Sequence, residues 1–122
     1  MTQSDLRGRR VLVVEDESRI AMLIRDTLED LGCQVVAIAS RLEEARARAA
    51  SLEFDVALLD VDLHGEPGYP VADELAARDI PFVLVTGYGA PAVPADLEDA
   101  PSVQKPFLRA ELERALRIAL GC

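Results

Sequence analysis

The chain alternates short apolar runs with longer stretches in which apolar residues recur every three or four positions. The short runs consist mostly of Val, Leu, Ile and Ala, a composition typical of strands buried in a parallel sheet. The predicted strands are residues 10–15, 34–39, 56–60, 81–85 and 102–104.

The stretches between these runs predict helices. Gly32 follows the first of them, and glycine commonly stands just past a helix end. Ser40 and Glu43 have the spacing of a capping box, which marks the start of the second helix. Pro70 suits the first turn of the third, because proline has no N–H to donate there. The predicted helices are residues 18–31, 40–50, a third that begins at Pro70, and 107–120.

Strands that alternate with helices predict an α/β fold, here a doubly wound, five-stranded parallel sheet with helices on both faces. Pro91, Pro94 and Pro101 interrupt the interval between Gly89 and Ser102. Proline disfavours a continuing helix, so the fourth helix is expected to be short, displaced or mobile. The helix positions expected to face the sheet are Ile20, Leu23, Ile24, Leu28 and Leu31; Leu42, Ala45 and Ala49; Val71, Ala72, Leu75 and Ala76; and Leu108, Leu112, Ala115, Leu116 and Ala119.

Composition narrows the class of protein. The 122 residues have the length of one domain, and half of them are apolar. Thirteen Lys and Arg against 22 Asp and Glu give a net charge of −9 without the basic stripe of a nucleic-acid binder, so protein partners are expected. No run approaches the roughly 18 apolar residues of a membrane span, and no signal peptide opens the chain, so a cytoplasmic location is expected. Cys33 and Cys122 match neither a zinc pattern nor a disulfide framework.

Residues with reactive or charged side chains follow four of the predicted strands. Glu15 and Asp16 follow the first strand, Asp60 ends the third, Thr86 follows the fourth, and Lys105 follows the fifth. Open parallel sheets gather ligand chemistry at the carboxyl ends of their strands, so we expect these residues to converge. Phosphoryl transfer to a carboxylate needs a nucleophile, a cation and hydrogen-bond donors, and Mg²⁺ prefers oxygen ligands.

Taken singly, each residue has a simpler explanation. Acids at a strand end are often solvated turn residues, a threonine there is ordinary, and Lys105 alone is more often a surface charge. His64, the single histidine, is interpreted as a solvated loop residue rather than a ligand. The common register of the four strand ends favours the functional interpretation.

The order Glu15-Asp16, Asp60, Thr86 and Lys105-Pro106 over five β/α units resembles the receiver domain of bacterial two-component response regulators. The resemblance covers residues 10–120, with 1–9 as an N-terminal tail, and implies a CheY-like, flavodoxin-like fold. It implies a phosphoacceptor signalling protein rather than an enzyme, with magnesium, or manganese in its place, as the cofactor.

Two loop motifs resemble a subgroup, the single-domain receivers common in alphaproteobacteria. These are residues 85–89, Val-Thr-Gly-Tyr-Gly, and Gly65-Glu66-Pro67 followed by residues 69–72. The subgroup carries Phe-Ala-Thr-Gly-(Tyr or Gly) on its fourth strand, and Leu84-Val85 replace the Phe-Ala here. Most receivers also place an aromatic switch residue three positions before the lysine, where this chain has Ser102.

The resemblance implies a role for each site residue. Asp60 would be the phosphoacceptor and a metal ligand, and the backbone carbonyl of Asp62 would complete the metal set. Glu15 and Asp16 would be the other ligands, Asp16 directly and Glu15 through water. Lys105 would pair with Asp60 and then with the phosphoryl group, and the Thr86 hydroxyl would follow that group. Tyr88 would either shield the phosphoryl group from water or cover the neighbouring loop.

The resemblance also implies partners. A sensor histidine kinase or histidine phosphotransfer protein would supply the phosphoryl group, and its docking face would include Ile20, Ala21 and Ile24. No output domain follows, so an unknown downstream protein, or competition for phosphate as a sink, would carry the signal. The last helix ends without a linker, which favours a complete protein over an excised domain.

Two rival functions remain open on the sequence. Asp60-x-Asp62 matches the nucleophile and acid/base pair of haloacid-dehalogenase-like phosphatases, although only Glu111 and Glu113 follow Lys105. A receiver-like interaction module that is not phosphorylated is the other rival, and Ser102 favours it. A nucleotide-binding site is disfavoured, because no Gly-x-Gly-x-x-Gly or P-loop follows the first strand.

Overall fold

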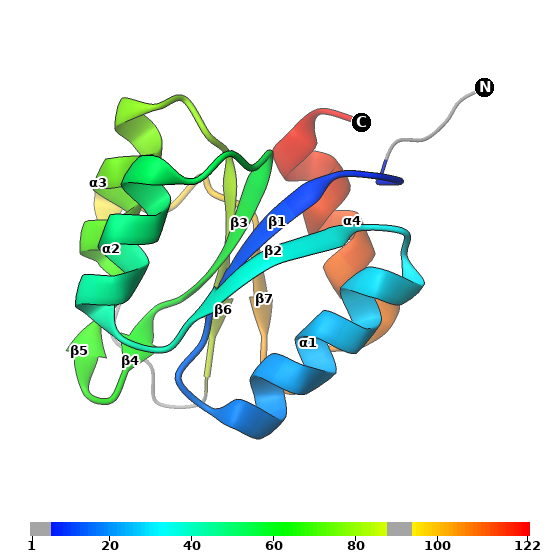
Figure 1. Ribbon diagram of the computed structural model, residues 1–122, viewed down its shortest axis with the longest axis horizontal. Helices are drawn as coiled ribbons and strands as arrows, with labels where there is room; N and C mark the ends of the chain where they lie inside the picture. Colours follow the sequence, from blue (N-terminus) through cyan, green and yellow to red (C-terminus); the bar gives the residue numbers. More distant parts are fainter. Residues whose placement is uncertain (1–5, 88–93) are drawn as a thin grey trace.

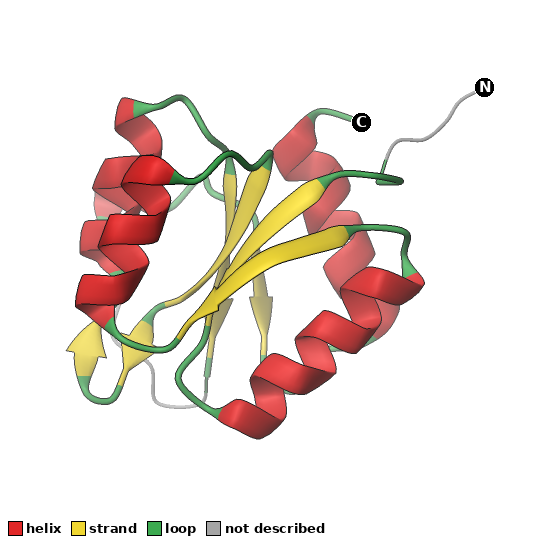
Figure 2. Ribbon diagram, viewed as in Figure 1, coloured by secondary structure: helices red, strands yellow, loops and turns green. Residues whose placement is uncertain are grey.

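The computed structural model describes residues 6–87 and 94–122, which form a twisted parallel sheet between two layers of helices (Figures 1 and 2). The sheet has the strand order β2-β1-β3-β6-β7, and every neighbouring pair in it is parallel. Its strands are β1 Arg10–Val14, β2 Gln34–Ala39, β3 Val56–Asp60, β6 Phe82–Thr86 and β7 Ser102–Gln104. The predicted doubly wound α/β architecture is confirmed.

The helices lie on both faces of the sheet, and the side chains of β1 show how each face is filled. Val11 and Val13 pack with α1 and α4, whereas Leu12 and Val14 pack with α2 and α3. All five residues of β3 are buried, because this strand lies at the centre of the sheet with helices on either side. The helices are α1 Ser18–Asp30, α2 Leu42–Ser51, α3 Tyr69–Ala77 and α4 Arg109–Leu120.

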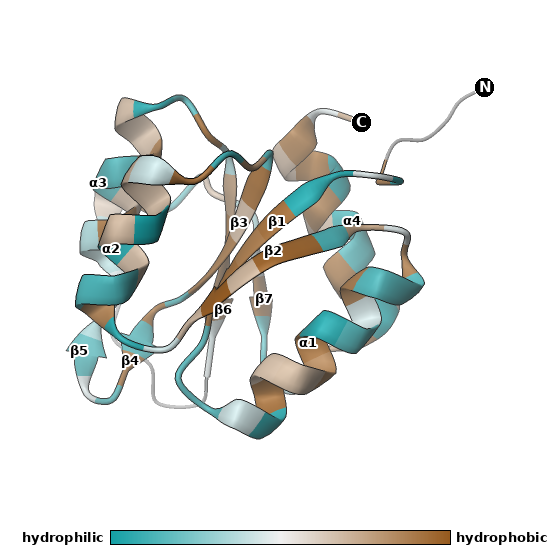
Figure 3. Ribbon diagram, viewed as in Figure 1, coloured by the Kyte–Doolittle hydropathy of each residue, from teal (hydrophilic) through white to brown (hydrophobic). Residues whose placement is uncertain are grey.

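Hydropathy follows this layering, with hydrophobic residues along the strands and hydrophilic ones on the outer faces of the helices (Figure 3). Three predicted core positions are wrong. Leu23 of α1 is 63% exposed, Leu108 just before α4 is 70% exposed, and Ala76 near the end of α3 is also exposed. Leu23 lines an open cleft, Ala76 lies in the last turn of α3, and Leu108 is the N-cap of α4.

The predicted capping box of α2 is wrong by one residue. Arg41 is the N-cap, and the backbone N–H of Ser40 donates to Oε1 of Glu44 at 3.1 Å rather than pairing with Glu43. Helix α3 does carry its proline in the first turn, as predicted.

Arg78 joins the two helices of one layer. Its Nη1 donates to the backbone carbonyls of Ala49 and Leu52, both at 2.7 Å, and its Nη2 lies 3.2 Å from Glu53. The guanidinium also stands 5.6 Å from the ring centroid of Phe54. Arg78 at the end of α3 therefore satisfies carbonyls at the end of α2 that the helix leaves without partners.

Two short strands, β4 Asp62–Leu63 and β5 Glu66–Pro67, form an antiparallel hairpin after β3 that the sequence did not predict. Between β6 and β7 the described residues contain one 3₁₀ turn, η1 Ala95–Leu97, consistent with a short fourth helix. Tyr88, Gly89 and Pro91 lie outside the described residues. Across residues 6–87 and 94–122, no helix reaches the length and apolarity that a membrane span requires.

Candidate functional site

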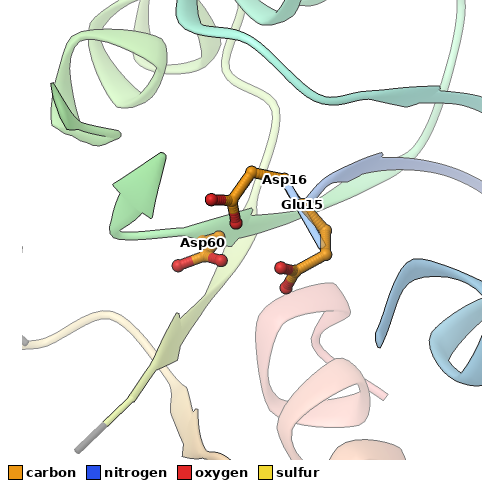
Figure 4. Close-up of side chains that lie close together, drawn as sticks. All are labelled: Glu15, Asp16 and Asp60. Atoms are coloured by element: carbon orange, nitrogen blue, oxygen red, sulfur yellow. The ribbon is translucent and has the colours of Figure 1, made fainter. Parts of the chain in front are cut away.

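Three carboxylates meet at the carboxyl ends of β1 and β3. Glu15, Asp16 and Asp60 each offer an oxygen that lies within 4.8 Å of the others (Figure 4). The pairing of Val14 with Leu59 places the ends of the two strands side by side, so residues 45 positions apart become neighbours. The convergence of these acids is therefore as predicted.

Asp60 is buried, with 2% of its surface exposed, and both of its oxygens are held. Oδ1 accepts a hydrogen bond from the backbone N–H of Asp62 at 2.9 Å, and Oδ2 accepts one from Nζ of Lys105, also at 2.9 Å. A buried charge needs such partners, because the desolvation of an unpaired carboxylate is costly. The two bonds fix the carboxylate at the floor of the site.

Glu15 is buried beside Asp60, and its two oxygens differ. Oε2 accepts the backbone N–H of Glu17 at 3.1 Å. Oε1 forms an ion pair with Lys105, 3.0 Å from its Nζ, and has no further hydrogen-bond partner among the described residues. Burial raises the pKa of Glu15 to about 7, against the lowering effects of Lys105 and the Glu17 N–H.

Lys105 is the cation of the cluster, on the loop that follows β7. Its backbone N–H donates to the carbonyl of Thr86 at 2.8 Å, which holds the loop against the end of β6. Burial lowers the pKa of Lys105, but the carboxylates of Asp60 and Glu15 raise it more, so the net pKa lies above its ordinary value. The ammonium therefore offsets part of the repulsion between the two acids.

Asp16 lies closer to solvent, and its side chain is 13% exposed. Its Oδ2 accepts the backbone N–H of His64 at 3.0 Å, and Nδ1 of the His64 ring stands 3.5 Å from the same oxygen. Burial raises the pKa of Asp16, but the hydrogen bonds, first that from His64, lower it below its ordinary value overall. His64 is a loop residue, as predicted, but it contacts the site.

Thr86 and Asp62 are adjacent to the cluster, but their side chains have other partners. The Thr86 hydroxyl donates to the backbone carbonyl of Val103 at 3.4 Å. The Asp62 side chain is exposed, and its Oδ1 accepts the backbone N–H of Gly65 at 2.9 Å. Asp62 reaches Asp60 through its own N–H instead.

An open cleft of about 510 Å³ leads to the acids. Its polar wall includes Asp16, Asp60, Asp62 and Lys105. Its apolar rim comprises Ile20, Leu23, Pro106 and Phe107. Of the predicted docking residues, Ile20 lines this rim, whereas Ala21 and Ile24 are buried at 5% and 1% exposure and belong to the core. The family resemblance that suggested these three residues did not separate the two environments.

Gly68 is a site residue that the sequence did not single out. Its N–H donates to the carbonyl of Val61 at 2.9 Å, and a Cβ added to it would overlap the backbone oxygen of Asp60. Its φ is negative, so no turn requirement explains it, and the glycine is required by close approach alone.

The cluster fits a divalent cation on two grounds. Three carboxylates face one ammonium, which leaves negative charge in excess, and the buried Oε1 of Glu15 is without a hydrogen-bond partner among the described residues. Buried carboxylate oxygens normally have hydrogen-bond partners as well as a counter-charge, so an Oε1 that meets only the ammonium of Lys105 leaves a place for a metal ion or its bound water. The donors are all oxygen, as Mg²⁺ prefers.

Comparisons with known proteins agree with this geometry. The family model for the response regulator receiver domain matches residues 11–117. PdtaR, a transcriptional regulatory protein of Mycobacterium tuberculosis, is 30% identical over 117 residues, covering 93% of this chain and 57% of that protein. This chain thus spans little more than half the length of that curated relative.

Solved structures are similar over nearly the whole chain. SdrG from Sphingomonas melonis Fr1 has a TM-score of 0.84 at 41% identity, covering 98% of this chain and all of that one. The receiver domain of PhyR from Erythrobacter litoralis has a TM-score of 0.82 at 25% identity, covering 95% and 92%. These two similarities support the predicted closeness to alphaproteobacterial receivers.

A third structure bears on the metal. The receiver domain of the sensor histidine kinase PA1611 from Pseudomonas aeruginosa PAO1 has a TM-score of 0.77 at 30% identity, covering 94% of this chain and 99% of that one. It holds a magnesium ion coordinated in its active-site cleft. The sequence match, the fold and the acidic cleft agree, and the chain belongs to the response regulator receiver domain family of two-component systems.

Proposed function

We propose that Asp60 accepts a phosphoryl group from the phosphohistidine of a histidine kinase or histidine phosphotransfer protein, in a magnesium-dependent reaction. The observation that carries this proposal is the environment of Asp60. It is a buried carboxylate at the end of the central strand, with Lys105 on one oxygen and the Asp62 N–H on the other, at the bottom of an open cleft.

The transfer is an in-line displacement at phosphorus. A carboxylate oxygen of Asp60 forms the new P–O bond as the P–N bond to histidine breaks, and the departing imidazole keeps the electron pair of that bond. The product is an acyl phosphate on Asp60. Lys105, 2.9 Å from Oδ2, is close enough to pair with a phosphoryl oxygen once that carboxylate oxygen is esterified.

The metal would be held by Glu15, Asp16, Asp60 and the backbone carbonyl of Asp62, with Asp16 as a direct ligand and Glu15 acting through water. A bound Mg²⁺, or Mn²⁺ in its place, would neutralise charge on the phosphoryl oxygens. The depth of the two side chains supports a direct role for Asp16 and a water-mediated role for Glu15. The oxygens of Glu15 lie deeper than those of Asp16 and beside Lys105. Few protein ligands suffice, since Mg²⁺ usually keeps several waters.

The signal leaves the site through Thr86. Its hydroxyl is held to the Val103 carbonyl of the edge strand β7 by a long bond of 3.4 Å, which a phosphoryl oxygen can replace with a stronger, charge-assisted one. Release of that bond would free the Val103 carbonyl, next to Ser102 on the edge strand, and so would give the edge a change that does not depend on an aromatic side chain.

In this proposal residues 10–120 are the receiver unit, which works in the cytoplasm. The apolar rim of Ile20, Leu23 and Phe107 is the surface that receives the phosphodonor protein. The output passes to a separate downstream protein, or the receiver competes for phosphoryl groups as a sink. The protein promotes its own phosphorylation and dephosphorylation without acting as an enzyme on other molecules.

The test is intact-mass measurement after incubation with acetyl phosphate and Mg²⁺. One phosphoryl adduct is expected on the wild type and on Asp73→Asn, whose exposed aspartate on α3 is a matched control. The adduct should be absent from Asp60→Asn and from the wild type in EDTA. If a purified kinase also gives no adduct on folded wild type, the interaction-module alternative replaces this proposal.

A further inference from the structure

The β4–β5 hairpin lies directly beside the acid cluster. Asp62 pairs with Pro67 and Leu63 pairs with Glu66, so His64 and Gly65 form a two-residue turn. Both have positive φ, 53° for His64 and 84° for Gly65, as a type I′ turn requires. Leu63 is 1% exposed and anchors the hairpin in the core. The strand that leads into the turn is thus anchored in the core, and the pairing of Leu63 with Glu66 closes the turn.

The backbone N–H groups of this hairpin point to the carboxylates of the site. Asp62 N–H bonds Oδ1 of Asp60 at 2.9 Å, His64 N–H bonds Oδ2 of Asp16 at 3.0 Å, and Gly65 N–H bonds Oδ1 of Asp62 at 2.9 Å. Asp16 is on the segment after β1, 48 positions from His64. The hydrogen bond from His64 therefore connects the hairpin to the segment that follows β1.

We infer that the hairpin is a positioning element for the metal site, and that His64 orients Asp16 through its backbone N–H. This inference rests on one part of the proposed function, namely that Asp16 is a direct ligand of the metal, and not on the phosphorylation of Asp60. The two oxygens of a carboxylate are rigidly joined, so fixing Oδ2 also fixes where Oδ1 lies. Groups that orient metal ligands in this way typically change metal affinity by about 10- to 100-fold when removed.

The backbone N–H, rather than the imidazole, has the geometry for this role. The ring nitrogen Nδ1 stands 3.5 Å from Asp16 Oδ2, beyond an ordinary hydrogen bond, and the side chain is 65% exposed. The N–H reaches the same oxygen at 3.0 Å. Its direction depends on the turn, and hence on the positive φ of Gly65.

The first experiment measures the Mg²⁺ dissociation constant by calorimetry in two matched variants. Gly65→Val places a β-branched residue at positive φ and should force the turn out of type I′. Gly121→Val does the same at φ 74° beyond α4, and at both glycines an added Cβ would meet nothing within 4 Å. We expect Mg²⁺ affinity to fall about tenfold in Gly65→Val and to stay within about twofold of wild type in Gly121→Val.

A third variant separates the backbone from the ring. His64→Gly keeps the N–H, suits the positive φ and removes the imidazole, so its Mg²⁺ affinity should stay within about threefold of wild type. A loss equal to that of Gly65→Val would assign the effect to the ring and overturn the inference. Equal affinities in Gly65→Val and Gly121→Val would overturn it as well, as would a wild type that binds no Mg²⁺.

Amide hydrogen exchange in the metal-free protein tests the bond itself. In Asp16→Ala, the His64 amide should exchange at least about tenfold faster, while the Gly65 amide, bonded to Asp62 in the same turn, should not change. Equal acceleration of both amides would mean that the turn has melted and would count against positioning. These readouts need no phosphorylation, so a missing adduct on Asp60 would sink the proposed function and leave this inference standing.

Discussion

Replacing Glu15 with glutamine tests how the fold prepares the acid cluster for a cation. Burial raises the pKa of Glu15 from 4.5 to about 7. Without metal, the native protein keeps this proton at pH values where the unfolded chain has lost it. The stabilising contribution is therefore full below pH 4.5 and is lost as the pH rises to about 7.

The size of the effect follows from the two pKa values. The change from 4.5 to about 7 corresponds to about 3 kcal/mol of folding free energy, a large part of the roughly 5–15 kcal/mol of a typical domain. Asp16 and Asp55 have lowered pKa values, so their contributions to stability are lost as the pH falls below the interval from 4.5 to 7. Lys105 has a raised pKa, so its contribution changes only above that interval. Glu15→Gln should remove the loss between pH 5 and 8.

The assay is urea denaturation in EDTA at about pH 5 and pH 8. From the lower to the higher pH, wild type should lose about 2.5 kcal/mol more than Glu15→Gln, because part of the change has already occurred at about pH 5. The exposed substitution Glu29→Gln should follow wild type. If the stabilities of wild type and Glu15→Gln depend on pH in the same way, ionising Glu15 costs no folding free energy. That result would refute the claim that burial raises its pKa.

Three further predictions follow from the contacts around the site. Gly68→Ala should lower the free energy of unfolding by roughly 1–3 kcal/mol, because the added Cβ overlaps the backbone oxygen of Asp60. Gly87→Ala has space for a Cβ and should change the free energy of unfolding by less than about 1 kcal/mol, as urea denaturation of both variants can show. By the same measurement Arg78→Ala should cost about 2–3 kcal/mol of stability, and Arg78→Lys should lie between it and wild type. The Mg²⁺ affinity should not change, because the lost hydrogen bonds are to carbonyls at the end of α2. Calorimetry should show Mg²⁺ binding tighten from pH 6 to 8, because Glu15 must lose its proton; affinity independent of pH would contradict this.

The strands and the meeting of the acids were predictable from the sequence because both depend on regular rules. Apolar runs between polar segments predict buried parallel strands, and the bounds of β2, β3 and β7 agree with the predicted ones. The ends of parallel strands lie at one edge, so Glu15, Asp16, Asp60 and Lys105 converge without any knowledge of side-chain packing. Thr86 reaches the same edge, but its hydroxyl turns to Val103, which depends on local geometry.

The errors occur where the environment depends on tertiary contacts. Residues 20, 23 and 24 have the spacing of one helix face, yet Leu23 is exposed in the cleft whereas Ile24 is buried in the core. The need for glycine at position 68 comes from the Asp60 backbone, eight residues earlier, and no local pattern reports it. The hairpin has only two residues in each strand, too few for a period of two to be visible.

The central claim is that Asp60 carries the phosphoryl group, and peptide mapping of the phosphorylated protein tests it most directly. Borohydride reduces an acyl phosphate on aspartate to homoserine, and trypsin separates residues 49–78, which contain Asp60, from residues 11–19, which contain Glu15 and Asp16. Homoserine is expected at position 60 after treatment with phosphodonor and Mg²⁺, and none in EDTA. Homoserine at another aspartate, or phosphoryl groups that borohydride leaves untouched, would contradict it.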